Sequence, residues 1–323
     1  ATVVRDLATA LSPEVDVAVF YIDVEEVRLE GLRTHTLVVD DFPVLRTHPR
    51  SPSQRPFIDL STDEIDAYLA RVERACREVV RSFEPDVIHV HHGWLGAVVA
   101  HRMQQEFGTP YLVQFHGTEL EVREDYAVRH PEILAHLDSL VRAGLAGAAC
   151  FATISPTEET KTKSYAAAAG LEVPVRMIPN GYDENIFQRR KADIEAINEK
   201  HATKLAGRRL DPARPVVLYV GRFAGFKGIE HLVRAAPLYA STGAQTVLCG
   251  DGDLRTAMIA LSEELGSTDT HFFGHVDHFD DLPDLYCAAD VLVVPSQGEP
   301  FGLVAIEALG CGTPVIGSRS GAL

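Results

Sequence analysis

The sequence predicts an α/β protein with two doubly wound domains, each a parallel β-sheet covered by helices. Three observations point to this fold class. Apolar runs of strand length alternate with amphipathic stretches of helix length along almost the whole chain. The 323 residues exceed the size at which one hydrophobic core usually keeps growing. The alternation also breaks between residues 188 and 214, where no strand-like run occurs.

The expected elements follow one another in a regular order. Strand-like runs occupy residues 15–23, 36–40, 86–92, 111–117, 148–155, 175–179, 216–221, 244–250, 270–276, 290–295 and 313–317. Helical patterns lie between many of them, for example over 63–83, 156–169, 229–242 and 253–266, with Thr62 and Ser155 as expected N-caps. This order favours parallel sheets, because neighbouring parallel strands are joined by crossover helices.

The break in the pattern divides the chain. Residues 1–187 form the expected N-terminal domain, residues 188–214 the linker and residues 215–323 the C-terminal domain. The chain enters a helix-like pattern with no strand before it, and it stops just after a strand. A doubly wound domain normally opens with a strand, so we expect further segments at both ends.

Composition limits the classes of partner. The formal net charge of −16 makes nucleic acid an unlikely partner. No apolar run approaches the roughly 20 residues of a membrane span. The five cysteines are scattered and include no Cys-x-x-Cys pair, which is typical of reduced thiols in a cytoplasmic protein.

The stretch from Asp290 to Leu309 carries the clearest functional pattern. A buried strand runs into the loop Pro295-Ser-Gln-Gly-Glu-Pro-Phe-Gly and then into a helix. The N-terminus of a helix favours an anion such as phosphate, because its first amides lack intrahelical partners. Glu299 and Glu307 flank that point, and carboxylates accept hydrogen bonds from sugar hydroxyls. Phosphate and sugar recognised together indicate a nucleotide sugar.

Two cations follow another strand, in Gly221-Arg-Phe-Ala-Gly-Phe-Lys227-Gly. Arg222 offers a planar fork for phosphate oxygens and Lys227 a compact point charge, so both suit a departing diphosphate. Taken alone, the segment is equally well explained as a solvated loop. The Glu299–Glu307 segment in the same domain favours the functional interpretation.

Weaker patterns leave alternatives open. Gly250-Asp-Gly-Asp253 reads as a tight strand-to-helix turn rather than a metal-binding acidic pair, since further oxygen ligands at calcium spacing are absent. His116 ends a strand and could touch a sugar, although a lone strand-end histidine is more often structural. His89 and His91 share one face of a strand, and packing explains them better than a metal pair. Pro179-Asn-Gly-Tyr-Asp183 is a turn signature.

Together these motifs resemble glycosyltransferase family 4, the retaining nucleotide-sugar transferases of GT-B fold. The matching segments are Phe151-Ala-Thr-Ile-Ser155, Ile178-Pro-Asn-Gly-Tyr-Asp183, Gly-Arg222 with Lys227-Gly, Gly250-Asp-Gly, Phe273-Gly-His-Val276, Leu285-Tyr-Cys-Ala-Ala-Asp290, Glu299-(x7)-Glu307 and Cys311-Gly-Thr-Pro-Val. The GT-B fold implies two Rossmann-like domains facing a central cleft. The Gly-Gly loop of that family, which contacts donor phosphate and acceptor, would precede Ala1.

The resemblance also implies roles for matching positions. Arg222 and Lys227 hold the donor diphosphate, Glu299 the hydroxyls of the donor sugar and Glu307 the ribose. The backbone amides of the first turn after the loop receive phosphate, namely those of Phe301, Gly302, Leu303 and Val304. The backbone at His275 and Val276 meets the base, Asn180 and Gly250 also lie on the donor side, and His116 lies beside the transferred sugar.

The expected activity is transfer of a hexose-type sugar from a nucleoside diphosphate, with UDP-sugars favoured, to a hydroxyl of a small-molecule acceptor. No cofactor or metal is expected, because the two cations and the helix terminus stabilise the leaving group. A GT-B-like nucleotide-sugar epimerase and a non-catalytic sugar-nucleotide-binding module are the alternatives. Acceptor specificity is expected in loops around residues 45–59 and 119–130.

Overall fold

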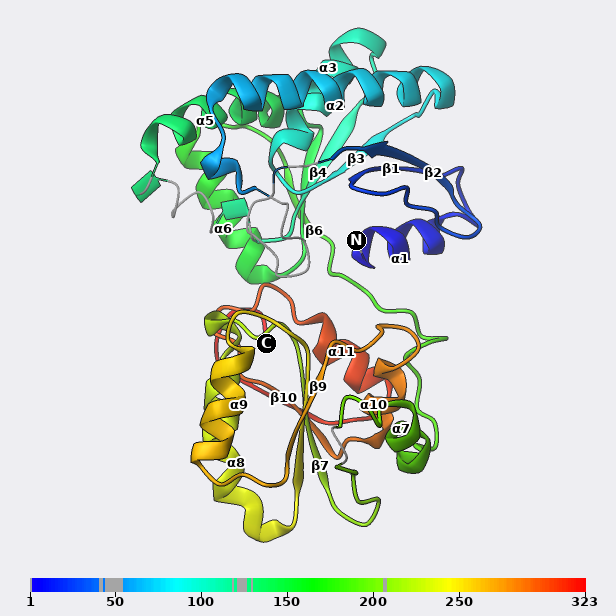
Figure 1. Cartoon of the computed structure of the whole chain (residues 1–323). Helices are drawn as coiled ribbons and strands as arrows, with labels where there is room; N and C mark the ends of the chain where they lie inside the picture. The colour runs from blue at the N-terminus through cyan, green and yellow to red at the C-terminus, as the bar shows by residue number, and fades with distance from the viewer. Residues whose placement is uncertain are drawn as a thin grey trace. The chain divides into compact units, whose positions relative to one another are not determined.

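The computed structural model describes residues 2–40, 43, 55–117, 119–120, 127–128, 130–205 and 208–323. The chain divides into two compact units, Ala1–Pro179 and Asn180–Leu323. Every strand pairing among the described residues is parallel, and helices accompany the strands in both units (Figure 1). The α/β prediction is therefore confirmed. None of the described helices is both long and apolar enough to cross a membrane.

The first unit contains two parallel sheets. Its four-stranded sheet runs in the order β3 (Ile88–His91), β4 (Tyr111–Phe115), β5 (Cys150–Thr153), β6 (Val175–Met177). A separate pair joins β1 (Ala18–Asp23) to β2 (Arg33–Val38). The helices of this unit are α1 (Thr2–Leu11), α2 (Thr62–Phe83), α3 (Leu95–Phe107), α5 (Pro131–Ala146) and α6 (Pro156–Ala168), with a short 3-10 turn, η1 (Phe57–Asp59).

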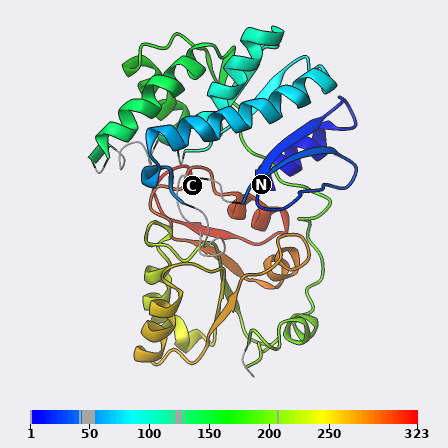
Figure 2. The ribbon, with the colours of Figure 1, turned by 45° about the horizontal axis from the view of Figure 1, so that its top comes forward.

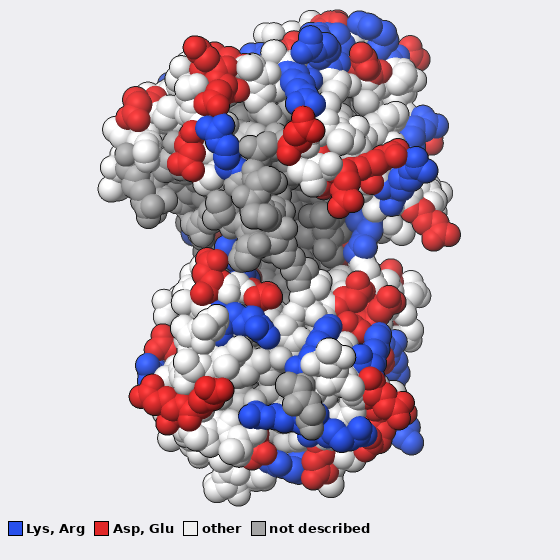
Figure 3. Space-filling model, viewed as in Figure 1, with Lys and Arg blue, Asp and Glu red and all other residues white. Residues whose placement is uncertain are grey.

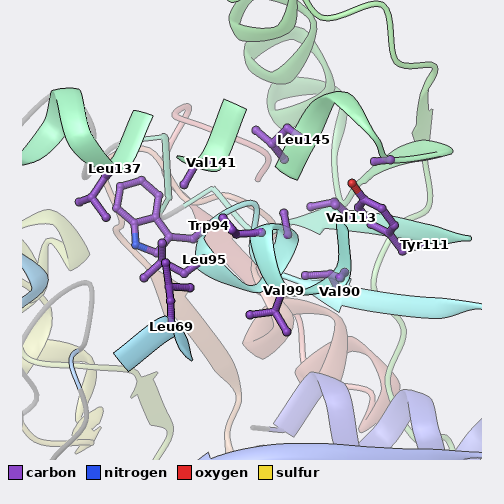
Figure 4. Packing of buried hydrophobic residues seen from close by; sticks show 14 of the residues in the cluster. Leu69, Val90, Trp94, Leu95, Val99, Tyr111, Val113, Leu137, Val141 and Leu145 are labelled. Carbon is purple, nitrogen blue, oxygen red and sulfur yellow. The ribbon is translucent and has the colours of Figure 1, made fainter. Parts of the chain in front are cut away.

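Helices α2, α3 and α5 enclose the core of the first unit with the strands β3 and β4. Figure 4 shows Leu69, Val99, Tyr111 and Leu137 among the side chains of this cluster. Helix α5 lies directly on α3 at Gly144, where an added Cβ would come within 2.6 Å of the Val98 backbone nitrogen. The core therefore depends on close helix packing as well as on apolar burial.

The helix starts follow from short polar side chains. Ser155 is the N-cap of α6, as predicted, and its Oγ accepts a bond from the Glu158 amide at 3.3 Å. The prediction of Thr62 as the N-cap of α2 is wrong. Ser61 has extended backbone geometry and forms a capping box with Glu64, whose carboxylate accepts from the Ser61 amide at 2.9 Å. Thr62 is therefore already the first helical residue.

The second unit is a five-stranded parallel sheet in the order β11-β10-β7-β8-β9. Its strands are β7 (Val216–Val220), β8 (Gln245–Cys249), β9 (Thr270–Gly274), β10 (Val291–Val294) and β11 (Val315–Gly317). Its helices are α7 (Ile194–Lys200), α8 (Ile229–Tyr239), α9 (Arg255–Glu264), α10 (Leu282–Ala288) and α11 (Leu303–Gly310), with the 3-10 turns η2 (Gly225–Lys227) and η3 (Ala240–Thr242). Helices α8 and α9 cover one face, and α10 and α11 the other (Figures 1 and 2). This arrangement is doubly wound.

The stretch expected to link the domains, residues 188–214, lies inside the second unit. It contains α7, and its Ile197 and Leu205 are buried in the core of that unit. The Asn198 side chain exchanges two hydrogen bonds with the Leu210 backbone, each of 2.8 Å. Buried contacts therefore fix this polar segment to the second unit rather than leaving it as a spacer.

Charges of both signs are interspersed over the surface. On the face in Figure 3, basic and acidic side chains alternate over both units, and no broad basic surface gathers among the described residues there. All five cysteines are free thiols, with Cys249 and Cys311 buried.

Candidate functional site

The order of strands in the second unit creates a switch point. Strands β7 and β10 are neighbours, paired at Val217–Val291 and Leu218–Leu292. From β7 the sheet continues to β8 on one side, and from β10 to β11 on the other. Loops that leave such a pair of strands diverge, and ligands of doubly wound sheets bind there, beyond the carboxyl ends of the strands.

The loops after β7 and β10 are in direct backbone contact. The Gln297 amide donates to the Phe226 carbonyl oxygen at 2.7 Å. Gly228 has a φ of +65°, and an added Cβ would lie 2.1 Å from the Pro295 carbonyl oxygen. Only a glycine fits this contact without displacing the chain. The two loops that carry the predicted charged residues are thus held against each other.

Lys227 and Glu299 form an ion pair across these two loops. The Nζ atom of Lys227 lies 2.8 Å from Oε2 of Glu299. Lys227 ends the turn η2, and its side chain is 23% exposed, whereas that of Glu299 is 10% exposed. The Glu299 backbone is fixed as well, because its carbonyl oxygen accepts from the Ala322 amide at 2.8 Å. The structure therefore brings together the predicted phosphate cation and the predicted sugar carboxylate.

Arg222 follows β7 in a loop that is bonded to its neighbours. The Tyr219 hydroxyl donates to the Arg222 carbonyl oxygen at 2.9 Å. The next residue, Phe223, donates its amide to the Asp251 carbonyl oxygen at 2.9 Å. The loop after β8 thus supports the loop that carries Arg222.

Gly250 is part of that support. It has a φ of +137°, and an added Cβ would lie 1.8 Å from the Gly221 carbonyl oxygen. Its amide donates to the Gly274 carbonyl oxygen at 2.7 Å. In the Gly-Asp-Gly turn, Asp251 accepts through Oδ1 from the Gly252 amide at 2.8 Å. The neighbouring backbone therefore explains the need for glycine at position 250, and this agrees with the tight-turn interpretation of the segment.

Helix α11 places the second glutamate. The helix starts after Gly302, which has a φ of +88°, so the amides of Leu303 and Val304 lie in its first turn and those of Phe301 and Gly302 lie just before it. Glu307 lies one turn further along and is buried, with 3% exposure. Its carboxylate accepts from the Tyr286 hydroxyl at 2.9 Å and lies 3.5 Å from Nε2 of His278.

Sequence reasoning missed Tyr286 and His278 as partners of Glu307. Burial, together with the carboxylate of Glu307, raises the pKa of the Tyr286 hydroxyl well above its usual value, so Tyr286 acts as a donor. Tyr286 lies in the motif Leu285-Tyr-Cys-Ala-Ala-Asp290. A hydroxyl donor in that motif was the signal that could have identified it. These contacts fix the carboxylate of Glu307 before any ligand arrives.

The remaining predicted donor residues lie at the edges of this group. The His275 carbonyl oxygen, just after β9, accepts from Nζ of Lys204 at 2.7 Å. The side chain of Val276 is buried in the core of the second unit. Asn180 is the first residue of that unit, outside the network described above.

In the first unit, four histidines and a glutamate gather where β3 and β4 end. Nδ1 of His91 lies 3.0 Å from Nε2 of His116. The ring of His89 stacks on that of His91 at 4.3 Å, and the ring of His92 lies 4.7 Å from that of His116. Among the residues that the structure describes, no group of three or more ligating side chains could hold a metal ion.

Burial sets the protonation of this cluster. Burial and the positive charge of neighbouring histidines lower the pKa of His91 to about 3 and that of His116 to about 4. Both rings are therefore neutral at neutral pH. Burial opposes ionisation of Glu119, but the interactions of its carboxylate with His92 and with backbone amides outweigh burial and lower its pKa. Sequence reasoning gave this carboxylate no role.

A cavity of about 520 Å³ lies away from the switch point, between α9, β9 and the residues Leu205 and Arg208. Its walls include Lys204, Arg208, Arg255 and Glu263. None of the predicted site residues lines it. The convergence of charged side chains at the carboxyl ends of β7 and β10 is therefore the better guide to the candidate site than the volume of this cavity.

Two family models match the chain and together cover most of it. One described as "Glycosyl transferase 4-like domain" matches residues 1–181, and one described as "Glycosyl transferases group 1" matches residues 202–323. The chain is 31% identical over 265 residues to "2-deoxystreptamine glucosyltransferase" from Streptomyces kanamyceticus, an alignment that covers 80% of this chain and 65% of that protein.

Two further similarities extend this result. The chain is 30% identical over 283 residues to "D-inositol 3-phosphate glycosyltransferase" from Acidothermus cellulolyticus, covering 83% of this chain and 60% of that protein. The solved structure of sucrose-phosphate synthase from Thermosynechococcus elongatus aligns with a TM-score of 0.71 at 28% identity, over 98% of this chain and 75% of that one. The chain thus spans less than two thirds of the length of both curated relatives.

Proposed function

Because the chain belongs to the family 4 glycosyltransferases of GT-B fold, we propose that it transfers a hexose-type sugar from a nucleoside diphosphate to an acceptor hydroxyl, with retention of configuration. The observation that supports this most strongly is the Lys227–Glu299 pair at the carboxyl ends of β7 and β10. A cation for phosphate and a carboxylate for hydroxyls stand within one hydrogen bond of each other. A sugar joined to a diphosphate carries hydroxyls for the carboxylate and, next to them, phosphate oxygens for the cation.

Each group has a proposed task in donor binding. Lys227, Arg222 and the first-turn amides of α11 bind the diphosphate, since charge-assisted bonds and helix termini favour phosphate. Glu299 accepts from hydroxyls of the transferred sugar. Glu307, already held by Tyr286, accepts from the ribose. Backbone groups at His275 and Val276 meet the base, and UDP is the favoured nucleotide.

The chemistry requires little of the protein beyond positioning and charge. The bond between the anomeric carbon and the diphosphate oxygen breaks, and the acceptor oxygen bonds to the same carbon on the same face. The acceptor proton passes to an oxygen of the leaving diphosphate. Lys227 and Arg222 stabilise the charge that grows on that diphosphate, so no metal ion is required. His116, neutral at neutral pH, is proposed to offer the transferred sugar a hydrogen bond rather than a positive charge.

A panel of donors tests the proposal directly. The melting temperature of the protein is measured with UDP-, GDP- and ADP-sugars, since a ligand that binds the folded state raises it. The donor that stabilises most is then incubated with acceptors that include 2-deoxystreptamine and D-inositol 3-phosphate, named in the relatives. We expect a UDP-hexose to give the largest shift and a glycosylated product. Conversion of the donor into an epimer without acceptor would indicate an epimerase instead. Binding of the donor without any product would indicate a binding module.

A further inference from the structure

One buried carboxylate joins the loops that leave two neighbouring strands of the first unit. Glu119 is fully buried, and its Oε1 accepts from the Gly93 amide at 3.2 Å and from the His116 amide at 3.0 Å. Gly93 follows β3, and His116 follows β4. Hydrogen bonds to an ionised carboxylate are about twice as strong as neutral ones, and removing it would leave buried amides unsatisfied.

The loop after β3 is shaped for this contact. His92 has a φ of +69°, a left-handed conformation that non-glycine residues rarely adopt. That conformation turns the next amide, that of Gly93, toward Glu119 and leaves Nδ1 of His92 at 3.5 Å from Oε2. Gly93 itself lies against Phe115, because an added Cβ would come within 2.4 Å of the aromatic ring. Backbone strain is thus retained at the point where the carboxylate binds.

His116 is consequently held at two points by different elements. Glu119 fixes its backbone amide, and His91 on the adjacent strand fixes its ring through the 3.0 Å contact between Nδ1 and Nε2. With both rings neutral, one nitrogen of this contact donates and the other accepts. A shift of the loop after β4 would separate the two rings, since the contact joins two different strands.

We infer that Glu119 is a positioning residue for glycosyl transfer, whose carboxylate holds the loop of His116 so that the imidazole keeps its hydrogen bond to His91. The inference rests on the proposed function of His116 at the transferred sugar. The role is geometric: a group that accepts hydrogen bonds from both amides is needed, and the negative charge is not.

Two substitutions separate geometry from charge. Glu119→Gln keeps an oxygen that can accept from both amides, so kcat should stay within about threefold of wild type. Glu119→Ala removes the acceptor, and kcat should fall about 100-fold with little change in donor KM, because a misplacement of about 1 Å can cost that much. Glu119→Asp keeps the charge but withdraws the carboxylate by one methylene, so kcat should fall about tenfold.

A second measurement does not depend on activity. With ¹⁵N-labelled histidine, the hydrogen bond between the His91 and His116 rings gives a two-bond ¹⁵N–¹⁵N coupling. We expect this coupling in wild type and Glu119→Gln and its loss in Glu119→Ala. Glu73→Gln is the matched control, because Glu73 is another carboxylate of the first unit that bonds to Arg77 and Arg102 away from the cluster. That control should keep both kcat and the coupling.

The outcomes are distinct. A folded Glu119→Ala with wild-type kcat and intact coupling would overturn the inference. So would a Glu119→Gln variant that is more impaired than Glu119→Asp, since charge would then be the requirement. If Glu119→Ala does not fold, the kcat of Glu119→Gln is compared with that of Glu119→Asp. A lower kcat for Glu119→Gln would overturn the inference. A wild-type protein that transfers no sugar would contradict the proposed function, while the coupling would still decide whether Glu119 positions His116.

Discussion

The ammonium of Lys227 lies 2.8 Å from the carboxylate of Glu299, although 72 residues separate them in the sequence. The pair joins the loops after β7 and β10, which are neighbours because the sheet is doubly wound. In the proposed donor complex, diphosphate competes with Glu299 for Lys227 and sugar hydroxyls compete with Lys227 for Glu299. Each residue therefore exchanges one partner for another, and the site is charged and ordered before the donor binds.

Loss of the Lys227 ammonium should impair chemistry without unfolding the protein. Lys227→Ala is expected to lower kcat by about 10²- to 10³-fold, because one group that stabilises the leaving charge is removed. The protein should still fold, although its melting temperature should fall by several degrees, because the largely buried Glu299 carboxylate loses its partner. Steady-state kinetics and thermal unfolding check both expectations.

Lys200→Ala is the matched control for that variant. Lys200 also pairs with a carboxylate of the second unit, at 2.7 Å from Asp281, but it lies on α7. Wild-type turnover is expected for this variant. Near wild-type turnover in Lys227→Ala, on a confirmed donor and acceptor, would remove Lys227 from the proposed mechanism.

Loss of the Glu299 charge should separate sugar recognition from phosphate recognition. Glu299→Gln releases Lys227 from its carboxylate partner, so a free nucleoside diphosphate should bind at least as tightly as it does to wild type. The intact nucleotide sugar should bind about tenfold more weakly, because an amide accepts less strongly from the sugar hydroxyls. Calorimetric titration with each ligand measures the two affinities. Equal weakening for both ligands would contradict the assignment of Glu299 to the sugar, and Glu230→Gln on the surface of α8 serves as control.

The fold class could be predicted from the sequence because alternating strand and helix patterns are local. The strand β10, expected at 290–295, occupies Val291–Val294, and α6, expected at 156–169, occupies Pro156–Ala168. The segment 188–214 was harder to interpret. The absence of a strand-like run indicated a linker, whereas the burial of Ile197 in the second unit depends on contacts that no local pattern contains.

The residues of the candidate site could be predicted from the sequence, but the contacts between them could not. Arg222, Lys227, Glu299 and Glu307 were selected by residue type and spacing within the family motif. The pairing of Lys227 with Glu299 depends on β7 lying beside β10, and strand order is a tertiary property. The link from Glu119 to Gly93 also spans 26 residues and joins the loops after two different strands, so neither residue alone signals it.

The turn at Gly250 should be intolerant of any side chain. Gly250→Ala places a Cβ 1.8 Å from the Gly221 carbonyl oxygen and also holds alanine at a φ of +137°. We expect a loss of about 3 kcal/mol in the free energy of unfolding, from overpacking added to backbone strain. Gly243→Ala isolates the strain, because Gly243 has a φ of +80° and nothing within 4 Å of an added Cβ. It should lose only about 1 kcal/mol in urea denaturation, and equal losses would show that contact with Gly221 is not responsible.

The histidine cluster should make the first unit less stable as pH falls below neutral. The pKa of His116 is lowered from 6.5 to about 4 and that of His91 to about 3, chiefly by burial. Between these values and 6.5 the unfolded chain binds more protons than the folded one, so the free energy of unfolding rises with pH. The contribution is complete above about pH 6.5 and is lost progressively as pH falls toward 4. The lowered pKa of Glu119 acts in the same direction below its unfolded value.

Replacing one ring tests this origin of the pH dependence. His91→Gln removes a group that must stay neutral, and an amide can still offer a hydrogen bond to His116. Urea denaturation at pH 7.5 and 5.5 should show that wild type loses more unfolding free energy on acidification than His91→Gln does. His231→Gln, on helix α8 of the second unit, should lose as much as wild type, because His231 lies outside the cluster. If His91→Gln and wild type lose the same amount between the two pH values, the buried rings of the first unit are not the source of the acid sensitivity.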